Sequence, residues 1–139
     1  MTTVLTTGVF DLFHRGHLQH LLSCAAMGDQ LIVMVDSDAR VKQAKGEHRP
    51  FIRQAERVAI VRSVRFVTAA NVFDFDGDID RAIRHFGATV LVGSRQYANG
   101  GTVIGAETIK ALGGTVRFVP ELEGVSTSLI IERIRHATD

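Results

Sequence analysis

Two histidines three residues apart follow a glycine turn near the start of the chain. His14 and His17 lie in the run Thr6-Thr7-Gly8-Val9-Phe10-Asp11-Leu12-Phe13-His14-Arg15-Gly16-His17. If this segment is helical, residues at that spacing share one face, so both imidazoles can reach one target. Paired imidazoles can stabilise the charge that develops on phosphoryl oxygens during an in-line transfer. The pair therefore predicts a site for a nucleoside triphosphate, with the α-phosphate as target.

The alternatives for the histidine pair are structural or metal-binding. One histidine could cap the turn while the other is an exposed helix residue. A metal pair is disfavoured, because no third or fourth ligand has compatible spacing. Gly8 and Gly16, which flank the turn, are explained either by relief of backbone strain or by close ligand approach. Asp11 has two interpretations: a structural one, in which it turns inward to hold the loop or bonds the backbone of its own turn, and contact with a magnesium ion.

A basic segment lies further along the chain. Lys42, Lys45 and Arg49, together with Gly46, could fold over a triphosphate as a mobile cationic lid. The alternative is a solvated surface loop, which is the usual role of a run of like charge.

Two further features are candidates for phosphate contacts. Arg57 could reach the phosphates, or it could form a surface ion pair with Glu56 or Asp38. Ser126 and Thr127 follow Gly124 and begin a helical pattern, and the free backbone N–H groups of a first helical turn favour phosphate. An ordinary helix cap at Ser126 or Thr127 is compatible with that role.

The elements that must position these residues alternate between strand and helix. Apolar runs predict strands at Val4–Val9, Gln30–Val35, Val64–Ala69, Thr89–Val92 and Thr115–Val119. Helical spacing predicts helices carrying Leu18 to Ala25, over residues 53–62, from Asp78 to a stop at Gly87, over Ala106–Leu112, and after Ser126 with Ile130, Ile131, Ile134 and Ala137 inward. Asp36–Pro50 and Gly93–Gly101 are predicted loops.

Strands that are apolar throughout indicate a parallel sheet covered on both faces. We therefore expect an α/β protein: a single-domain, Rossmann-like, doubly wound parallel five-stranded sheet with helices on both faces, spanning residues 1–139. Loops after the strands of such a sheet gather along one edge, where ligands bind. The candidate residues should converge there.

Composition limits the class of binding partner that the chain can have. The formal net charge of +1 provides no global attraction to nucleic acid or to a membrane, so small-molecule partners are expected. The single cysteine, Cys24, excludes an intramolecular disulfide and a cysteine-rich zinc site. No apolar run approaches the roughly 20 residues of a membrane span, and we expect a cytoplasmic protein.

Two motifs carry a resemblance to a known family. The chain resembles the cytidylyltransferase-like nucleotidyltransferases through their G-x-F-D-x-x-H-x-G-H signature, matched by Gly8 to His17, and through a G-[IV]-S-T-[ST] motif, matched by Gly124-Val125-Ser126-Thr127-Ser128. The resemblance covers nearly the entire chain. It implies transfer from a nucleoside triphosphate to a phosphorylated alcohol or sugar with release of pyrophosphate, usually with magnesium (Mg2+), and a homodimer.

The resemblance also implies roles for individual residues. His14 and His17 would stabilise the transition state, and Lys42 and Lys45 would contact phosphates. The nucleotide-binding residues would be Thr7, Gly8, Phe10, Asp11, Gly16, Arg57, Gly93, Ser126 and Thr127.

The resemblance also bears on which nucleoside triphosphate is the donor and which phosphorylated compound is the acceptor. Ser37-Asp38, Lys42, Lys45-Gly46 and Arg49-Pro50 are similar to the adenylyltransferase domain that makes ADP-heptose from heptose 1-phosphate, which favours ATP. Glycerol-3-phosphate cytidylyltransferases typically carry an arginine where this chain has Glu121, which disfavours CTP with a polyol phosphate as acceptor. Arg95 stands where the heptose enzymes usually carry an acidic residue. An inactive nucleotide-binding module is the remaining alternative, and the intact histidine pair argues against it.

Overall fold

The computed structural model describes residues 1–94 and 101–137, and strands alternate with helices along the chain. The strands are β1 (Thr3–Gly8), β2 (Gln30–Asp36), β3 (Ala69–Phe73), β4 (Val90–Ser94) and β5 (Thr115–Val119). The helices are α1 (Arg15–Ala25), α2 (Asp38–Lys45), α3 (Gln54–Arg62), α4 (Asp76–Phe86), α5 (Ala106–Ala111) and α6 (Thr127–Arg135).

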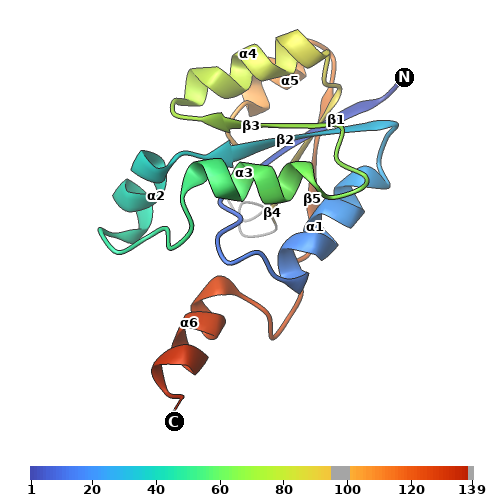
Figure 1. Ribbon diagram of the computed structural model, residues 1–139. Helices are drawn as coiled ribbons and strands as arrows, with labels where there is room; N and C mark the ends of the chain where they lie inside the picture. The colour runs from blue at the N-terminus through green and yellow to red at the C-terminus, as the bar shows by residue number, and fades with distance from the viewer. Residues whose placement is uncertain (95–100, 138–139) are drawn as a thin grey trace.

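All five strands pair in parallel in the order β3-β2-β1-β4-β5. The strand order reverses between β1 and β4, since the chain runs outward to β3 and then returns to the other side of β1 (Figure 1). Such a reversal is where open α/β sheets bind ligands. The predicted Rossmann-like parallel sheet is confirmed.

The core has two halves, because successive residues of a strand point to opposite faces of the sheet. Val4, Leu31 and Val33 pack on one side with residues of α1 and α3. Leu5 and Ile32 pack on the other side with residues of α4 and α5. Figure 1 shows these two helical layers above and below the sheet. Helices therefore cover both faces, as the continuously apolar strands predict.

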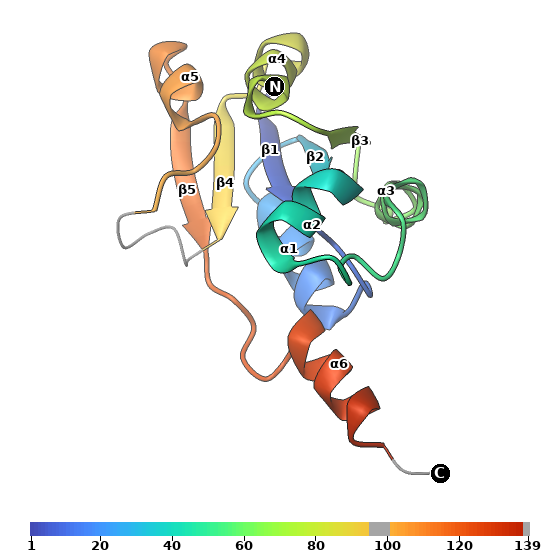
Figure 2. The same cartoon turned by 90° about the vertical axis from the view of Figure 1, so that its left-hand side faces the viewer.

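The carboxyl ends of the strands point toward one end of the molecule. Figure 2 shows β4 and β5 running toward the end where α6 lies, with α2 near the same edge. The segments that follow β1, β2, β4 and β5 thus begin at one edge of the sheet. Within the described residues, no helix is long and apolar enough to cross a membrane.

Two predicted boundaries are wrong. The segment Asp36–Pro50 contains the helix α2, which the Ser37 side chain caps by accepting from the Arg40 N–H at 3.2 Å. Only Val41 of this helix is buried, so it has no apolar stripe to reveal it. The third strand is Ala69–Phe73 and not Val64–Ala69: Phe66 and Val67 pack against the core from a turn, while the less apolar residues after them pair with β2.

The inward face predicted for the last helix is also wrong. No residue of α6 is buried, and Ile134 is 64% exposed. Both views show α6 projecting from the body (Figures 1 and 2). Its spacing of Ile130, Ile131 and Ile134 does form an apolar stripe, but the sheet and its covering helices do not extend far enough to bury it.

Candidate active site

A cavity of about 610 Å³ lies at the carboxyl edge of the sheet. Its wall is contributed by the β1–α1 turn, α2, the ends of β2, β3 and β4, and the segment leading into α6. The sequence-predicted residues in the wall are Thr7, Gly8, Phe10, Asp11, His14, Gly16, His17, Lys45, Arg49, Gly93, Ser126 and Thr127. The structure thus gathers most of the candidate residues around one hollow.

The two histidines are fixed by backbone hydrogen bonds at the start of α1. His14 is the N-cap, and its Nδ1 accepts from the Gly16 N–H at 3.0 Å. The Nδ1 of His17 accepts from the His14 N–H at 3.2 Å. An accepting Nδ1 carries no proton, so each neutral ring bears its hydrogen on Nε2. Capping and the predicted chemical role are therefore compatible, because the caps set the tautomer that presents Nε2–H.

His14 also joins the start of the chain to its last helix. The Thr127 hydroxyl donates to the Asp11 carbonyl oxygen at 3.0 Å and lies 3.3 Å from His14 Nε2. Since that Nε2 bears the hydrogen, it donates to the Thr127 oxygen. This chain of contacts holds the N-terminus of α6 against the β1–α1 turn.

The two imidazoles are stacked, and His17 is more deeply buried than His14. Their ring centroids lie 3.7 Å apart, at an interplanar angle of 23°. Burial, followed by the charges of His14, His20 and Lys45, lowers the pKa of His17 to about 3. Burial also lowers the pKa of His14. Both rings are therefore neutral hydrogen-bond donors near neutral pH.

Gly8 and Gly16 are required for space and not for backbone freedom, since neither has a positive φ. A Cβ at Gly8 would lie 2.7 Å from the Phe10 ring. A Cβ at Gly16 would lie 2.9 Å from the His14 ring. Strain relief is thus the wrong explanation for both glycines; each leaves room for a ring of the site.

The unusual backbone of the turn falls on two other residues. Phe10 and Leu12 have φ values of 55° and 50°, in the left-handed region that larger residues rarely adopt. Phe10 is buried, and its ring meets His17 edge to face at 5.4 Å between centroids. The turn thus places an aromatic wall behind the catalytic candidate.

Asp11 holds the loops together. Its carboxylate accepts from the backbone N–H groups of Leu12 at 3.1 Å, Phe51 at 2.8 Å and Ile52 at 2.9 Å. Of the two interpretations of Asp11, the structure supports the structural one. The segment after Pro50 is thereby tied to the histidine turn.

Only part of the basic segment, Lys42 to Arg49, lines the cavity. Lys45 and Arg49 line the cavity, whereas Lys42 is exposed and lies outside its lining. The Nε atom of Arg49 is buried and finds no hydrogen-bond partner among the described residues. A guanidinium held in this way can bind an anion that enters the cavity.

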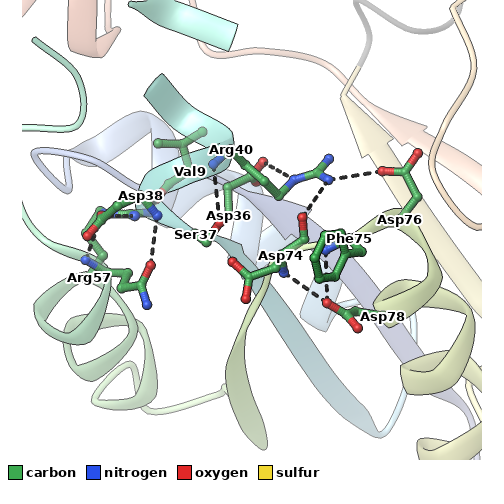
Figure 3. Close-up of polar contacts among 11 residues, drawn as sticks. Val9, Asp36, Ser37, Asp38, Arg40, Arg57, Asp74, Phe75, Asp76 and Asp78 are labelled. Carbon is green, nitrogen blue, oxygen red and sulfur yellow. Dashed lines mark hydrogen bonds and ion pairs between the residues drawn. The ribbon is translucent and has the colours of Figure 1, made fainter. Parts of the chain in front are cut away.

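Arg57 does not reach the cavity, contrary to its predicted phosphate contact. It is fully buried and donates to Val9 O at 2.7 Å, Ile52 O at 2.8 Å and Asp38 Oδ1 at 2.9 Å (Figure 3). The predicted alternative, an ion pair with Asp38, is present, but within the protein and not on its surface. Arg57 ties β1 and α2 to α3.

The start of α6 supplies a different kind of polar surface. The Ser126 hydroxyl caps the helix by accepting from the Leu129 N–H at 3.1 Å. Thr127 and Ser128 open the helix and line the cavity, so its free N–H groups lie at the cavity edge. Arg95, singled out in the sequence, lies outside the described residues.

Several lining residues were missed in the sequence. They include Gln19, His20, Asp36, Arg40 and Gln43. His20 is three residues beyond His17, and its Nε2 lies 2.9 Å from the Thr6 hydroxyl. Helical spacing could have found His20, and the predicted strand that Asp36 ends could have found Asp36. The cavity position of Arg40 depends on the unpredicted helix α2.

Comparisons with known proteins agree with this geometry. A family model described as cytidylyltransferase-like matches residues 5–133. The bifunctional protein HldE of Citrifermentans bemidjiense is 38% identical over 131 residues, covering 94% of this chain and 26% of the relative. HldE of Geotalea uraniireducens is 39% identical over 132 residues, with 95% and 26% covered. The chain thus spans about a quarter of the length of these relatives.

Solved structures share the fold. The lipopolysaccharide core biosynthesis protein from Thermoplasma volcanium has a TM-score of 0.66 at 24% identity, covering 88% of this chain and 97% of that one. Thermotoga maritima TmcAL, bound with alpha-thio ATP, has a TM-score of 0.61 at 14% identity, with 97% and 50% covered.

Proposed function

The chain belongs to the cytidylyltransferase-like family of nucleotidyltransferases, and on that premise we propose that it joins ATP to a sugar phosphate such as heptose 1-phosphate and releases pyrophosphate. The observation that carries the proposal is the capped histidine pair held against the N-terminus of α6 in one cavity. The choice of ATP rests on the resemblance of the segment from Ser37 to Pro50 to ADP-heptose-forming domains.

The reaction needs placement more than acid–base chemistry. An oxygen of the acceptor phosphate is already anionic near neutral pH, so it can attack the α-phosphorus without a strong base. The bond between that phosphorus and the oxygen that bridges to the β-phosphate breaks as the new bond forms. Pyrophosphate then leaves with that bridging oxygen and its electron pair. Stabilising the charge on the α-phosphate oxygens is the main task of the site.

The residues divide this task by position. His17 presents a neutral Nε2–H to the α-phosphate, and His14 orients it from the adjacent stacked ring while sharing its own Nε2–H with Thr127. Lys45 and Arg49 meet phosphate oxygens from the α2 side. The first turn of α6 receives the distal phosphates through its free N–H groups.

Magnesium enters this scheme with the nucleotide. Among the described residues, no group of three or more His, Cys, Asp or Glu side chains could hold a metal ion. The Asp11 carboxylate is already occupied by three N–H donors. We therefore propose that Mg2+ arrives on the triphosphate, the usual mode for this ion, and that the protein supplies no preformed cage.

The first experiment is a pyrophosphate-release assay with ATP and CTP tested separately against heptose 1-phosphate and glycerol 3-phosphate. Release that requires both ATP and the sugar phosphate supports the proposal. Release with CTP and glycerol 3-phosphate would replace it with a polyol-phosphate cytidylyltransferase. Nucleotide binding without release from any pair would favour a binding module.

The resemblance also implies a homodimer, which we include in the proposal. Exposed apolar side chains of α6, among them Leu129 at 44% and Ile134 at 64% exposure, offer apolar area that a second copy could bury.

A further inference from the structure

Three carboxylates line a cavity that otherwise suits anions. That of Asp11 is occupied by three backbone N–H donors and that of Glu121 is exposed, so Asp36 is the one whose position needs an explanation. Asp36 is the last residue of β2, its side chain is 21% exposed, and it lines the cavity. A carboxylate repels phosphate, so the triphosphate does not explain its position. Burial raises the pKa of Asp36, while Arg40 opposes that effect.

Arg40 fixes this carboxylate without covering it. Its Nη1 donates to the Asp74 carbonyl oxygen at 3.2 Å and to Asp76 Oδ1 at 3.1 Å (Figure 3). Its Cζ lies 4.5 Å from the centre of the Phe73 ring. These contacts hold Arg40 against the junction of β3 and α4. From there its Nε makes one long contact, 3.4 Å, to Asp36 Oδ2.

The two ends of the cavity differ in chemistry. On the β4 and β5 side the wall includes Val103, Ile104 and Leu122, which suit an apolar, flat group. On the β2 side it presents Asp36 and the amide of Gln43, which can accept hydrogen bonds from hydroxyls. The histidine turn lies between these ends because β1 lies between β2 and β4 in the sheet.

We propose that Asp36 is a specificity-determining residue, whose carboxylate, oriented by Arg40, accepts hydrogen bonds from the hydroxyls of the sugar that carries the attacking phosphate. The inference rests on the proposed transferase function, and it narrows the acceptor to polyhydroxylated phosphates. A hydrogen bond to a charged acceptor contributes more binding free energy than one between neutral groups. The site would therefore bind an acceptor that carries a hydroxyl at this position more tightly than one that lacks it.

The test compares Asp36→Asn with Asp76→Asn in the whole chain. Both substitutions remove a carboxylate that pairs with Arg40, but Asp76 is 73% exposed and does not line the cavity. The affinity of each variant for heptose 1-phosphate is measured by calorimetry with a non-hydrolysable ATP analogue bound. The affinities for ATP and for 2′-deoxy-ATP are measured alone, and they also report whether each variant is folded.

We expect Asp36→Asn to weaken heptose 1-phosphate binding at least about tenfold. Its affinities for ATP and 2′-deoxy-ATP should equal those of the wild type, and Asp76→Asn should bind all three like the wild type. Unchanged heptose 1-phosphate affinity in Asp36→Asn overturns the inference. So does a loss confined to ATP and absent with 2′-deoxy-ATP, which would assign the carboxylate to the ribose.

A wild type that does not bind heptose 1-phosphate also overturns the inference. The transferase proposal would still stand in that case if pyrophosphate is released with an acceptor that lacks sugar hydroxyls. Conversely, the protein could bind heptose 1-phosphate through Asp36 and release no pyrophosphate with any acceptor. That result would support the role of Asp36 and would contradict the proposed transferase reaction. The two failures are therefore separable.

Discussion

At the scale of single residues, the site depends on which nitrogen of each histidine carries the proton. His17 Nδ1 accepts a backbone hydrogen bond, which leaves Nε2–H for the substrate. An asparagine at position 17 could keep an acceptor near Nδ1 and would remove the Nε2 donor. The residue therefore offers a way to separate capping from chemistry.

We expect His17→Asn to lower kcat by about 100-fold or more, the usual loss when one charge-stabilising donor is removed. Nucleotide affinity should change little, because the distal phosphates are held elsewhere. The measurement is pyrophosphate release together with ATP binding. His85→Asn is the matched control, since His85 is exposed and lies outside the cavity lining. Full activity in His17→Asn would contradict the catalytic role.

The lowered pKa of His17 also makes stability depend on pH. Its pKa is about 3 in the folded protein and about 6.5 when unfolded. Between these two pKa values the unfolded chain binds more protons than the folded one. The ionisation of His17 therefore costs no stability above pH 6.5, and it lowers the free energy of unfolding as the pH falls from 6.5 toward 3.

We expect the wild type to lose up to about 1.4 kcal/mol per pH unit through His17 within that window. His17→Asn should show a shallower pH dependence, measured by urea unfolding at several pH values. Equal slopes for both proteins would show that the His17 ring is not held in its neutral form by the fold.

At the scale of elements, two buried side chains join segments that are distant in sequence. Asp11 ties the β1–α1 turn to the backbone of Phe51 and Ile52, and Arg57 ties β1 and α2 to α3. The sequence left these roles open, since Asp11 could also have met a magnesium ion and Arg57 could also have reached the phosphates. These ties set the rigidity of the cavity wall.

We expect Arg57→Met to lower the free energy of unfolding by about 3 kcal/mol, because the Asp38 carboxylate and two carbonyl oxygens lose their donor. The affinity of the folded variant for ATP should equal that of the wild type. Denaturant unfolding and calorimetry make the two measurements. Arg53→Met is a control from the same region whose side chain does not line the cavity. If Arg57→Met bound ATP more weakly and were as stable as the wild type, Arg57 would instead be a phosphate-binding residue.

Element prediction from the sequence succeeded where burial leaves a pattern. The strands β2 and β5 and the end of α4 at Gly87, with its φ of 66°, were predicted from apolar runs and a glycine stop. Helix α2 was missed because a helix with one buried residue has no apolar period. The left-handed turn at Phe10 was missed because tertiary packing, and not residue type, holds that backbone.

At the scale of the whole molecule, the candidate residues converge because the sheet is parallel. Every strand delivers its following segment to one edge, so residues from five parts of the chain line one cavity. That convergence could be predicted from the alternation of strands and helices, which indicates a parallel sheet. The position of α6 could not, because its apolar stripe finds no surface within the described chain.

We expect sedimentation equilibrium to show a dimer, since an exposed stripe of this kind is more stable when buried. The double variant Leu129→Ser/Ile134→Ser should shift the mass toward the monomer. Lys110→Ser/Arg133→Ser is a control of exposed polar positions. A wild-type monomer at all concentrations would remove the dimer from the proposal.

The Thr127–Asp11 hydrogen bond joins residues 116 positions apart, and this separation has a consequence for biosynthesis. All five strands precede α6, so the nascent chain can assemble its sheet and histidine turn before the last helix leaves the ribosome. The end of the cavity that Ser126 and Thr127 line is completed only after that release. A chain interrupted before Gly124 could thus fold its sheet and still lack one wall of the cavity.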